Sequence, residues 1–322
     1  MTKKTKILSF LLQYYQILML ALIIIFLSIT TESFLTLDNL QSVVMQQVPL
    51  LLIISIGMTT AIITKGIDNS IGSTLALSSC VAASIIVKGQ DILGIVVGLA
   101  IGCLVGFANG ILIAKVHLQP FITTYTMDMV IKGLAQLFMG GGIIYGFSES
   151  FCELGSGYIG GVSYLMIIAA VIFAVYLFVL SKTTFGKSVY AIGKNETATT
   201  LCGINADKIK IIVYTINGFL AAVAGLLYIS RLNAAESSIG DGYTMEMMAA
   251  TLIGGTPFSG GEGGIGRTLI GVCIMMFISN GMNLNNISSN WQDAVYGIVI
   301  IISLFLGVAG RSITQKFKLN EA

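Results

Sequence analysis

Residues 182–210, KTTFGKSVYAIGKNETATTLCGINADKIK, separate two long apolar runs and carry five lysines. The stretch is polar, and it contains a short segment with the pattern of a helix. Glu196 lies near the start of that segment and Gly203 lies just past its end, where acidic residues and glycine are favoured at helix termini. The sequence therefore predicts a compact cationic loop with its own helix, suited to docking a partner in the cytoplasm.

The composition of the whole chain is that of a membrane protein. Of 322 residues, 55% are hydrophobic and only 10% are charged, whereas soluble domains carry about 25% charged residues. We therefore expect an all-α, polytopic membrane protein in which residues 1–322 form a single transmembrane domain. The net charge of +2 excludes a large basic surface for nucleic acid. The five cysteines lack the spacing of a metal site or a disulfide framework, so we expect neither.

Apolar runs of bilayer-spanning length recur along the chain and predict about ten transmembrane helices. Two of them, 72–87 and 246–257, are short for a hydrocarbon core of about 30 Å and adjoin glycine-rich breaks. The lysines at the N-terminus resemble those of a signal peptide, but no small-residue cleavage site follows, so we expect a retained first span. The predicted spans are 11–31, 43–64, 72–87, 92–114, 120–139, 163–181, 209–230, 246–257, 266–284 and 291–310.

Basic residues indicate the orientation of these spans. With the N-terminus in the cytoplasm and alternating spans, fourteen Lys and Arg residues fall inside and two, Lys88 and Arg231, fall outside. This asymmetry is the one that cytoplasmic loops of membrane proteins show. Both termini and the 182–210 loop are therefore expected in the cytoplasm. The fourteen are Lys3, Lys4, Lys6, Lys65, Lys115, Lys182, Lys187, Lys194, Lys208, Lys210, Arg267, Arg311, Lys316 and Lys318.

The two halves of the chain resemble each other. Spans 92–114 and 266–284 contain Asn109-Gly110 and Asn280-Gly281, and they cross the membrane in opposite directions. Each half also has a glycine-interrupted segment, 66–72 and 254–264. Paired interrupted segments point to the permeation site of a transporter. We therefore expect inverted five-helix repeats, with Asp68, Asn69 and Ser70 of the first interruption on the translocation pathway.

Nucleotide binding and hydrolytic chemistry have little support in the sequence. The 254–264 loop lacks the Gly-Lys-Ser/Thr ending of a phosphate-binding loop, and Gly186-Lys187-Ser188 lacks the glycine five positions earlier and follows a membrane helix. His117 is the only histidine and lies at a predicted cytoplasmic edge. We expect no ATPase site, no cofactor, no metal and no catalytic residue in this chain.

Few ionisable groups fall within the predicted spans. Asp128 and Lys132 are four residues apart on one helix, and a mutual ion pair is favoured over a proton relay. Asp68 is expected to cap the following helix or brace its loop rather than contact a solute.

Uncharged polar side chains in the spans suit a neutral polyhydroxy solute. Amides can pair with hydroxyl groups, and aromatic faces can pack on the C–H face of a sugar ring. Each such residue also has a simpler role in joining helices. The candidates for the pathway are Asn109, Gln119, Phe121, Asn217, Asn280 and Asn283, with Tyr125 and Trp291 as further aromatic groups.

With no ion-coupling array and no nucleotide site, the energy for transport is expected to come from a separate cytoplasmic subunit. The short helix of the 182–210 loop is the predicted docking site for that ATPase. The predicted coupling residues are Gly193, Lys194, Asn195, Glu196, Ala198 and Gly203.

From about residue 45 to 309 the chain resembles the permease subunits of ATP-binding-cassette importers for simple sugars, the ribose/xylose/galactose class. Long motifs in a matching order carry the resemblance: GIDNSIGS (66–73), FANGILIAKVHLQPFI (107–122), TTFGKSVYAIGKNETATTLCGIN (183–205), KIKIIVYTINGFLAAVAGLLYISRL (208–232) and LIGGTPFSGGEGGIGRTLIG (252–271).

This resemblance implies a bacterial plasma-membrane protein working as a homodimer or close heterodimer of permeases, with two cytoplasmic ATPase domains and an extracytoplasmic sugar-binding protein. It also implies ten helices with inverted repeats, and a coupling helix at 193–203 that sits in a cleft of the ATPase.

The sequence departs from that family's pattern at Lys65, Asn69, Lys194, Arg267 and Asp128. These departures leave the identity of the solute open: a pentose or hexose is expected first, with nucleosides or branched-chain amino acids as alternatives. A stand-alone proton or sodium symporter, and a scaffold or sensor that transports nothing, are the competing hypotheses.

Overall fold

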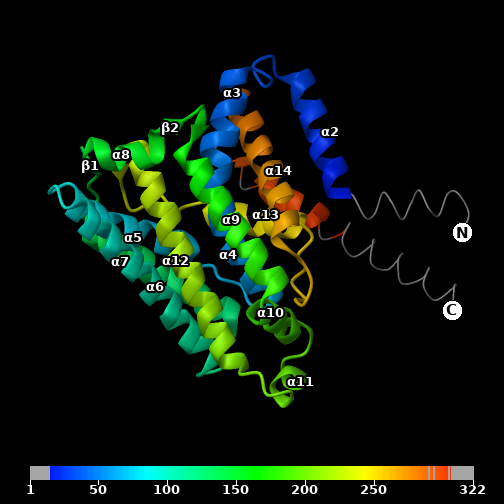
Figure 1. The fold of residues 1–322 in the computed structure, drawn as a ribbon. Helices are drawn as coiled ribbons and strands as arrows, with labels where there is room; N and C mark the ends of the chain where they lie inside the picture. Colours follow the sequence, from blue (N-terminus) through cyan, green and yellow to red (C-terminus); the bar gives the residue numbers. More distant parts are fainter. Residues whose placement is uncertain (1–14, 289–290, 293, 304, 306–322) are drawn as a thin grey trace, which may run out of the picture.

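A computed structural model describes residues 15–288, 291–292, 294–303 and 305 (Figure 1). Residues 1–14, which include the N-terminal lysines and the first four residues of the predicted first span, lie outside this range. The described chain is mostly helical, as predicted. Its helices are α2 (Tyr15–Thr30), α3 (Leu37–Ser42), the π-helical turn η1 (Val43–Gln47), α4 (Val48–Ile63), α5 (Ile71–Ile86), α6 (Asp91–Ala114), α7 (Pro120–Met139), α8 (Glu149–Ser156), α9 (Tyr164–Lys182), α10 (Thr184–Lys194), α11 (Glu196–Leu201), α12 (Ala206–Leu232), α13 (Tyr243–Ile253) and α14 (Ile265–Leu284).

Helices occupy the predicted apolar segments, and most boundaries agree within three residues. Of the last predicted span, 291–310, Ala294–Ser303 is described as an apolar helix and residues 304 and 306–310 are not described. In the described chain, five helical segments are long and apolar enough to cross a membrane: Leu37–Ile63, α6, α9, α12 and α14. The count of ten spans, the inverted repeats and the side on which the termini lie stay predictions.

Two short antiparallel strand pairs were not predicted. β1 (Ile144–Tyr145) pairs with β4 (Ala234–Ala235), and β2 (Tyr158–Ile159) pairs with β3 (Val162–Ser163). Both pairs lie at one end of the helical bundle together with α8, and α10 and α11 lie at the opposite end (Figure 1). The strands belong to the connections between helices, so the fold remains a helical bundle.

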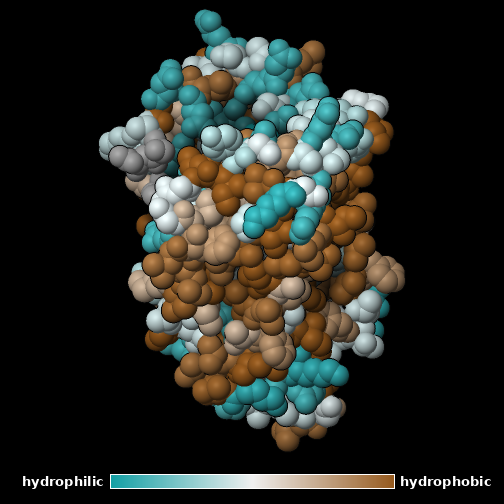
Figure 2. All heavy atoms as spheres, turned by 90° about the vertical axis from the view of Figure 1, so that its left-hand side faces the viewer, coloured by the Kyte–Doolittle hydropathy of each residue, from teal (hydrophilic) through white to brown (hydrophobic). Residues whose placement is uncertain are grey.

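The centre of the protein is α4, in which every residue from Val48 to Ile63 is buried. It packs against α9, α12, α13 and α14. An apolar helix that is buried all round cannot itself face lipid, so the surrounding helices must form the lipid-facing surface. In agreement, less than a third of the apolar stretch of α6 and of α9 is buried. A broad hydrophobic belt lies between polar ends on the face to which α6 and α7 contribute exposed apolar side chains (Figure 2).

A stripe of glycines on α6 allows close backbone packing against its neighbours. Glycine recurs every fourth residue on one face of this helix, at positions 94, 98, 102, 106 and 110. The first two face α5, and the last three face α12. A Cβ atom on Gly106 would overlap the backbone carbonyl of Tyr214, and one on Gly102 would overlap that of Gly218. Such stripes let membrane helices approach through their backbones, where lipid provides no hydrophobic drive for association.

Replacing Gly106 with alanine should therefore destabilise the fold. The added methyl group has to push α6 away from α12, and overpacking of this kind costs about 1–3 kcal/mol. The measurement is the thermal unfolding midpoint of the purified protein in detergent.

Gly133→Ala on α7 is the matched control, because no atom lies within 4 Å of its added Cβ and alanine favours helix more than glycine does. Equal midpoints for the two variants would contradict the close-packing account.

Candidate functional site

The predicted coupling loop forms two helices rather than one. α10 (Thr184–Lys194) was not predicted, and it begins where the Thr183 side chain accepts a hydrogen bond from the Gly186 N–H at 3.3 Å. α11 (Glu196–Leu201) corresponds to the predicted short helix. A single non-helical residue, Asn195, separates them, so the loop is a tight helical hairpin at the polar end of the bundle (Figure 1).

Both ends of α11 are capped. Asn195 Oδ1 accepts a hydrogen bond from the Ala198 N–H at 3.0 Å. At the other end Gly203 adopts a φ of 87°, and the Ile204 N–H donates to the Thr199 carbonyl at 3.3 Å. This is the hydrogen-bond pattern of a Schellman motif, in which glycine takes the left-handed position without strain. The predicted end of the helix at Gly203 is therefore confirmed, with the N-terminal cap supplied by Asn195.

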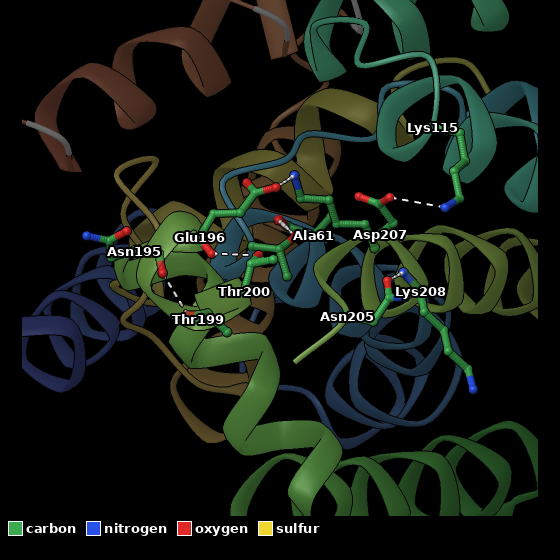
Figure 3. Close-up of polar contacts among 11 residues, drawn as sticks. Ala61, Lys115, Asn195, Glu196, Thr199, Thr200, Asn205, Asp207 and Lys208 are labelled. Atoms are coloured by element: carbon green, nitrogen blue, oxygen red, sulfur yellow. Dashed lines mark hydrogen bonds and ion pairs between the residues drawn. The ribbon is translucent and has the colours of Figure 1, made fainter. Parts of the chain in front are cut away.

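α11 presents an exposed face and is anchored through its opposite side (Figure 3). Glu196 and Ala198 are exposed and Thr199 is buried. Glu196 Oε1 pairs with Lys210 Nζ of α12 at 2.6 Å, and the Lys210 side chain is only 16% exposed. Leu201, which the sequence analysis did not select, is 85% exposed. An apolar residue within an otherwise polar loop is the only sequence signal that could have pointed to Leu201, and a single exposed leucine is by itself a weak signal.

The chain leaves the hairpin through a second set of fixed contacts. Asn205 Oδ1 accepts from the Lys208 N–H at 2.9 Å and so caps α12. Asp207 in the first turn of α12 pairs with Lys115 Nζ at 3.2 Å, which joins α12 to the end of α6 (Figure 3). Both partners are partly exposed, so the pair contributes positioning more than stability.

Gly193, the first predicted coupling residue, is buried behind α11 rather than exposed on it. A Cβ at this position would overlap the Ile63 carbonyl oxygen and the Gly261 backbone nitrogen. Those two atoms are themselves hydrogen-bonded, Gly261 N–H donating to Ile63 C=O at 2.8 Å. In addition, Tyr190 of α10 donates to the Gly263 carbonyl at 3.1 Å. The end of α10 therefore packs directly on the end of α4, shortly before the first interrupted segment (66–72), and on the second interrupted segment, 254–264.

The first interrupted segment is braced by a buried polar cluster. Asp68 Oδ1 accepts from Ser70 Oγ at 2.8 Å and from the Ser70 N–H at 3.2 Å. Asn109 Nδ2 donates to Ser70 Oγ at 2.7 Å, and Thr124 Oγ1 accepts from the Asn69 N–H at 3.1 Å. Ser70 precedes α5, and no side chain caps that helix. Asp68 therefore braces the loop and does not cap the helix.

Asn217 of α12 completes this cluster. Its amide nitrogen lies 3.3 Å from Asp68 Oδ2; with the amide turned over, the nitrogen donates instead to the carbonyls of Gly57 and Val213, at 3.0 and 3.1 Å. Both orientations tie α12 to its buried neighbours. The side chains of Asp68, Ser70 and Asn109 are at most 1% exposed, so the cluster is closed in this state.

The other predicted pathway residues do not join this cluster. Asn280 forms a reciprocal amide pair with Asn39, with distances of 2.8 and 3.0 Å. Asn283 accepts from Gln292 Nε2 at 2.8 Å. Gln119 and Phe121 are exposed at the start of α7. The structure thus separates the predicted set into a buried cluster, an amide pair on α14 and an exposed face of α7.

The prediction that Lys132 pairs with Asp128 is wrong. Lys132 Nζ lies 2.6 Å from Asp241 Oδ1, in the segment between β4 and α13. Asp128 makes no ion pair among the described residues. The spacing of four residues allows a pair along one helix, but tertiary packing brings a competing carboxylate to the lysine.

Comparison with known proteins decides between the classes of membrane protein that the sequence left open. Residues 41–304 match the family described as "Branched-chain amino acid transport system / permease component". The chain belongs to this permease family. The predicted resemblance to sugar-importer permeases is also confirmed by individual relatives. The chain is 37% identical over 303 residues to the ribose import permease protein RbsC of Escherichia coli strain K12, covering 92% of this chain and 94% of that protein.

Two further relatives extend the likeness. The ribose import permease protein RbsC of Bacillus subtilis strain 168 is 40% identical over 290 residues, covering 89% of this chain and 90% of that protein. The D-allose transport system permease protein AlsC of Escherichia coli strain K12 is 31% identical over 297 residues, covering 91% of each chain. No solved structure shows significant similarity to the chain.

Replacing Asp68 with alanine should destabilise the permease. The change leaves the buried N–H and hydroxyl groups of Ser70 without their acceptor, at a cost of about 1–3 kcal/mol for each unsatisfied group. The thermal unfolding midpoint in detergent measures this effect, with Gln119→Ala as an exposed polar control. An Asp68→Ala protein of unchanged stability that no longer transports would instead place Asp68 in contact with the solute.

Proposed function

We propose that the chain is the membrane-spanning permease of an ATP-binding-cassette importer that brings a simple sugar, first of all ribose, into the cytoplasm. Relatives named for ribose import match almost the whole chain at 37% and 40% identity. The structural observation that supports the proposal is the exposed, doubly capped α11, rigidly connected through Gly193 to the two interrupted segments.

The proposed topology has ten transmembrane helices in two inverted repeats, with both termini in the cytoplasm of a bacterium and the protein in its plasma membrane. The fourteen-to-two distribution of basic residues supports it. The helical hairpin of α10 and α11 then lies on the cytoplasmic side, and α8 with the two strand pairs lies outside. Lys65, Lys115 and the five lysines of residues 182–210 all belong to the cytoplasmic end in this arrangement.

Energy comes from a separate ATPase subunit that receives α11 in a cleft. Ala198 and the exposed Leu201, three residues apart, form the contact face, with Lys194 and Asn195 beside it, and Glu196 anchors α11 through Lys210 of α12. Gly193 and Gly203 contribute indirectly: Gly193 sets the position of α11, and Gly203 sets its end. ATP binding shifts the permease between states only insofar as the ATPase contacts α11 differently in each of them. The chain itself supplies no ATPase site.

The proposed translocation pathway lies between two copies of the permease, along α7. This helix exposes Phe121, Tyr125 and Met129 on one face, and the rings of Phe121 and Tyr125 are stacked with centroids 6.1 Å apart. Aromatic faces of this kind pack on the C–H face of a sugar. Thr124 of α7 holds the segment 67–69 by hydrogen bonds, and Asp68, Ser70, Asn109 and Asn217 form the buried cluster next to this segment.

Two groups in the buried cluster support a role in the pathway. Among the described residues, Asn69 Nδ2 and Asn109 Oδ1 are buried without a hydrogen-bond partner. Buried polar groups rarely remain unpaired without a reason. A shift of α7 would uncover one donor and one acceptor, which are the groups that a sugar hydroxyl needs. Asn280 and Asn283 lie on α14, and their place on the pathway requires the second copy or another state.

An extracytoplasmic sugar-binding protein is the third proposed partner, and it selects much of the substrate. The family description names branched-chain amino acids, so these solutes and nucleosides are the alternatives within the same mechanism. A stand-alone symporter is the alternative from another class. It predicts uptake by the purified chain alone in liposomes under an ion gradient, and loss of that uptake in Asp128→Asn.

Replacing Ala198 with tryptophan, or Glu196 with arginine, should abolish assembly with the ATPase. A large ring does not fit where a methyl group lies in the contact, and the arginine removes the ion pair with Lys210 and reverses the charge. Co-purification of the ATPase with the permease, and stimulation of its ATP hydrolysis, are the measurements.

Ile159→Trp is the control for added bulk, because Ile159 is 60% exposed at the opposite end of the bundle. Normal assembly of the Ala198→Trp protein would contradict the docking role of α11.

Cysteine cross-linking tests the proposed position of the pathway. With the native cysteines removed, Met129→Cys on α7 should be joined to its equivalent in a second copy by a short bifunctional maleimide, and excess substrate should slow the reaction. Val175→Cys on α9 is the control, because Val175 is similarly exposed, at 54% against 56% for Met129. Efficient joining through Val175 and none through Met129 would place the second copy on the α9 side.

A further inference from the structure

A cavity of about 680 Å³ lies between α9, α10 and the first turn of α14. It is separate from the buried polar cluster and from the exposed face of α7. Its apolar wall includes Leu177 and Leu180 of α9, and its polar wall includes Lys187, Lys194 and Arg267. Because the cavity has an apolar wall and three cations, it suits a ligand that has both an apolar part and a negatively charged part.

The cations reach the cavity because of helix geometry. Lys187, Tyr190 and Lys194 are spaced by three and four residues, so they lie on one face of α10. Leu177, Leu180 and Ser181 share one face of α9 for the same reason. Arg267 comes from the first turn of α14, more than seventy residues away in sequence. The three cations therefore converge through tertiary packing.

These cations are not neutralised by the described part of the protein. The ion pairs of that part join Lys115 to Asp207, Lys132 to Asp241 and Lys210 to Glu196. Glu262, in the adjoining 254–264 loop, is exposed and makes no ion pair with the three cations. Arg267 also acts on Tyr190: burial raises the pKa of the Tyr190 hydroxyl, and the positive charge of Arg267 partly offsets that rise.

The cavity lies where a bilayer surface would meet the protein. α9 is an apolar helix of spanning length whose surface is mostly unburied. It ends at Lys182, directly before α10. Leu177 and Phe178 near this end are 45% and 61% exposed. In the proposed topology, the apolar wall is level with the inner lipid leaflet and the cations are level with its phosphates.

We propose that this cavity binds an anionic phospholipid, with its phosphate between Lys187 and Arg267 and an acyl chain along Leu177 and Leu180. Phosphate groups pair strongly with arginine and lysine. The apolar wall then contacts the acyl chain, and the basic wall contacts the phosphate of the same lipid. A soluble phosphate would leave the apolar wall unused. The inference rests on the proposed placement of α10 at the cytoplasmic edge of the membrane.

A lipid in this position would contact the elements that connect α11 to the interior. Lys187, Tyr190 and Lys194 belong to the helix that ends at the Gly193 contact, and Tyr190 holds the Gly263 carbonyl. Bound lipid would therefore hold α10 against α14 and stiffen the connection between the docking helix and the interrupted segments.

Native mass spectrometry of the purified permease without its ATPase tests the proposal. The protein is released from detergent micelles titrated with phosphatidylglycerol or with phosphatidylcholine, which differ in net charge. We expect phosphatidylglycerol to bind more tightly. Lys187→Gln and Arg267→Gln should each weaken that preference about fivefold, and the double variant about 25-fold, because each cation near lipid phosphates contributes a comparable increment.

Controls separate a lipid site from general charge and from misfolding. Lys208→Gln changes an exposed cytoplasmic lysine that does not line the cavity and should leave the preference unchanged. Lys187→Arg and Arg267→Lys keep the charges and should retain most of it. Glycerol phosphate should not displace the lipid, because it has no acyl chain for the apolar wall.

Three results would overturn the proposal: equal binding of the two lipids, equal effects of Lys208→Gln and Arg267→Gln, or displacement by glycerol phosphate. A fourth is loss of ATPase assembly in Lys187→Gln with unchanged lipid binding, which would assign the cavity to acidic side chains of the ATPase. Because lipid binding is measured on the permease alone, these outcomes are distinguishable from failure of the proposed transport function.

Discussion

One backbone hydrogen bond, from the Gly261 N–H to the Ile63 carbonyl, joins the two places where the membrane helices are interrupted. Ile63 ends the fully buried α4, and Gly261 lies in the loop between α13 and α14. Irregular backbone inside a membrane must find partners within the protein. Gly193 can pack on this bond because it lacks a side chain. The position of α11, the proposed docking helix, therefore depends on the same contact that stabilises the interior.

This arrangement divides the molecule into a rigid part and an exposed part. The glycine stripe of α6, the buried α4 and the Asp68 cluster hold helices together through backbone contacts and buried hydrogen bonds. The exposed surfaces, which are the outer face of α11 and the apolar face of α7, have no such partners in one copy. A polar cluster that is closed in one copy cannot by itself conduct a solute, so transport requires movement or a second copy.

Much of the fold could be predicted from the sequence, because hydropathy and glycine directly report how long a helix is and where it stops. The ends of α7 at Met139 and of α11 before Gly203 are examples. α10 was missed because its face of lysines interrupts the apolar pattern that predicts membrane helices. The pairing of Lys132 was predicted wrongly, since spacing along one helix contains no information about Asp241 from a distant segment. Only part of the candidate site could be predicted from the sequence. Glu196 and Ala198 are exposed on α11, whereas Gly193 is buried in α10 and Leu201 was not selected.

The sequence by itself determined that this chain is a helical membrane protein, which end is rich in basic residues, and which family it belongs to, because these properties follow from composition, local patterns and long motifs in a matching order. Only the tertiary structure decided which polar groups meet. Asp68, Asn109 and Asn217 come from three segments. Lys187 and Arg267, which line the cavity between α9, α10 and α14, come from two. Contacts between such groups depend on how helices pack, and a one-dimensional pattern records the faces of a helix but not the neighbour that each face meets.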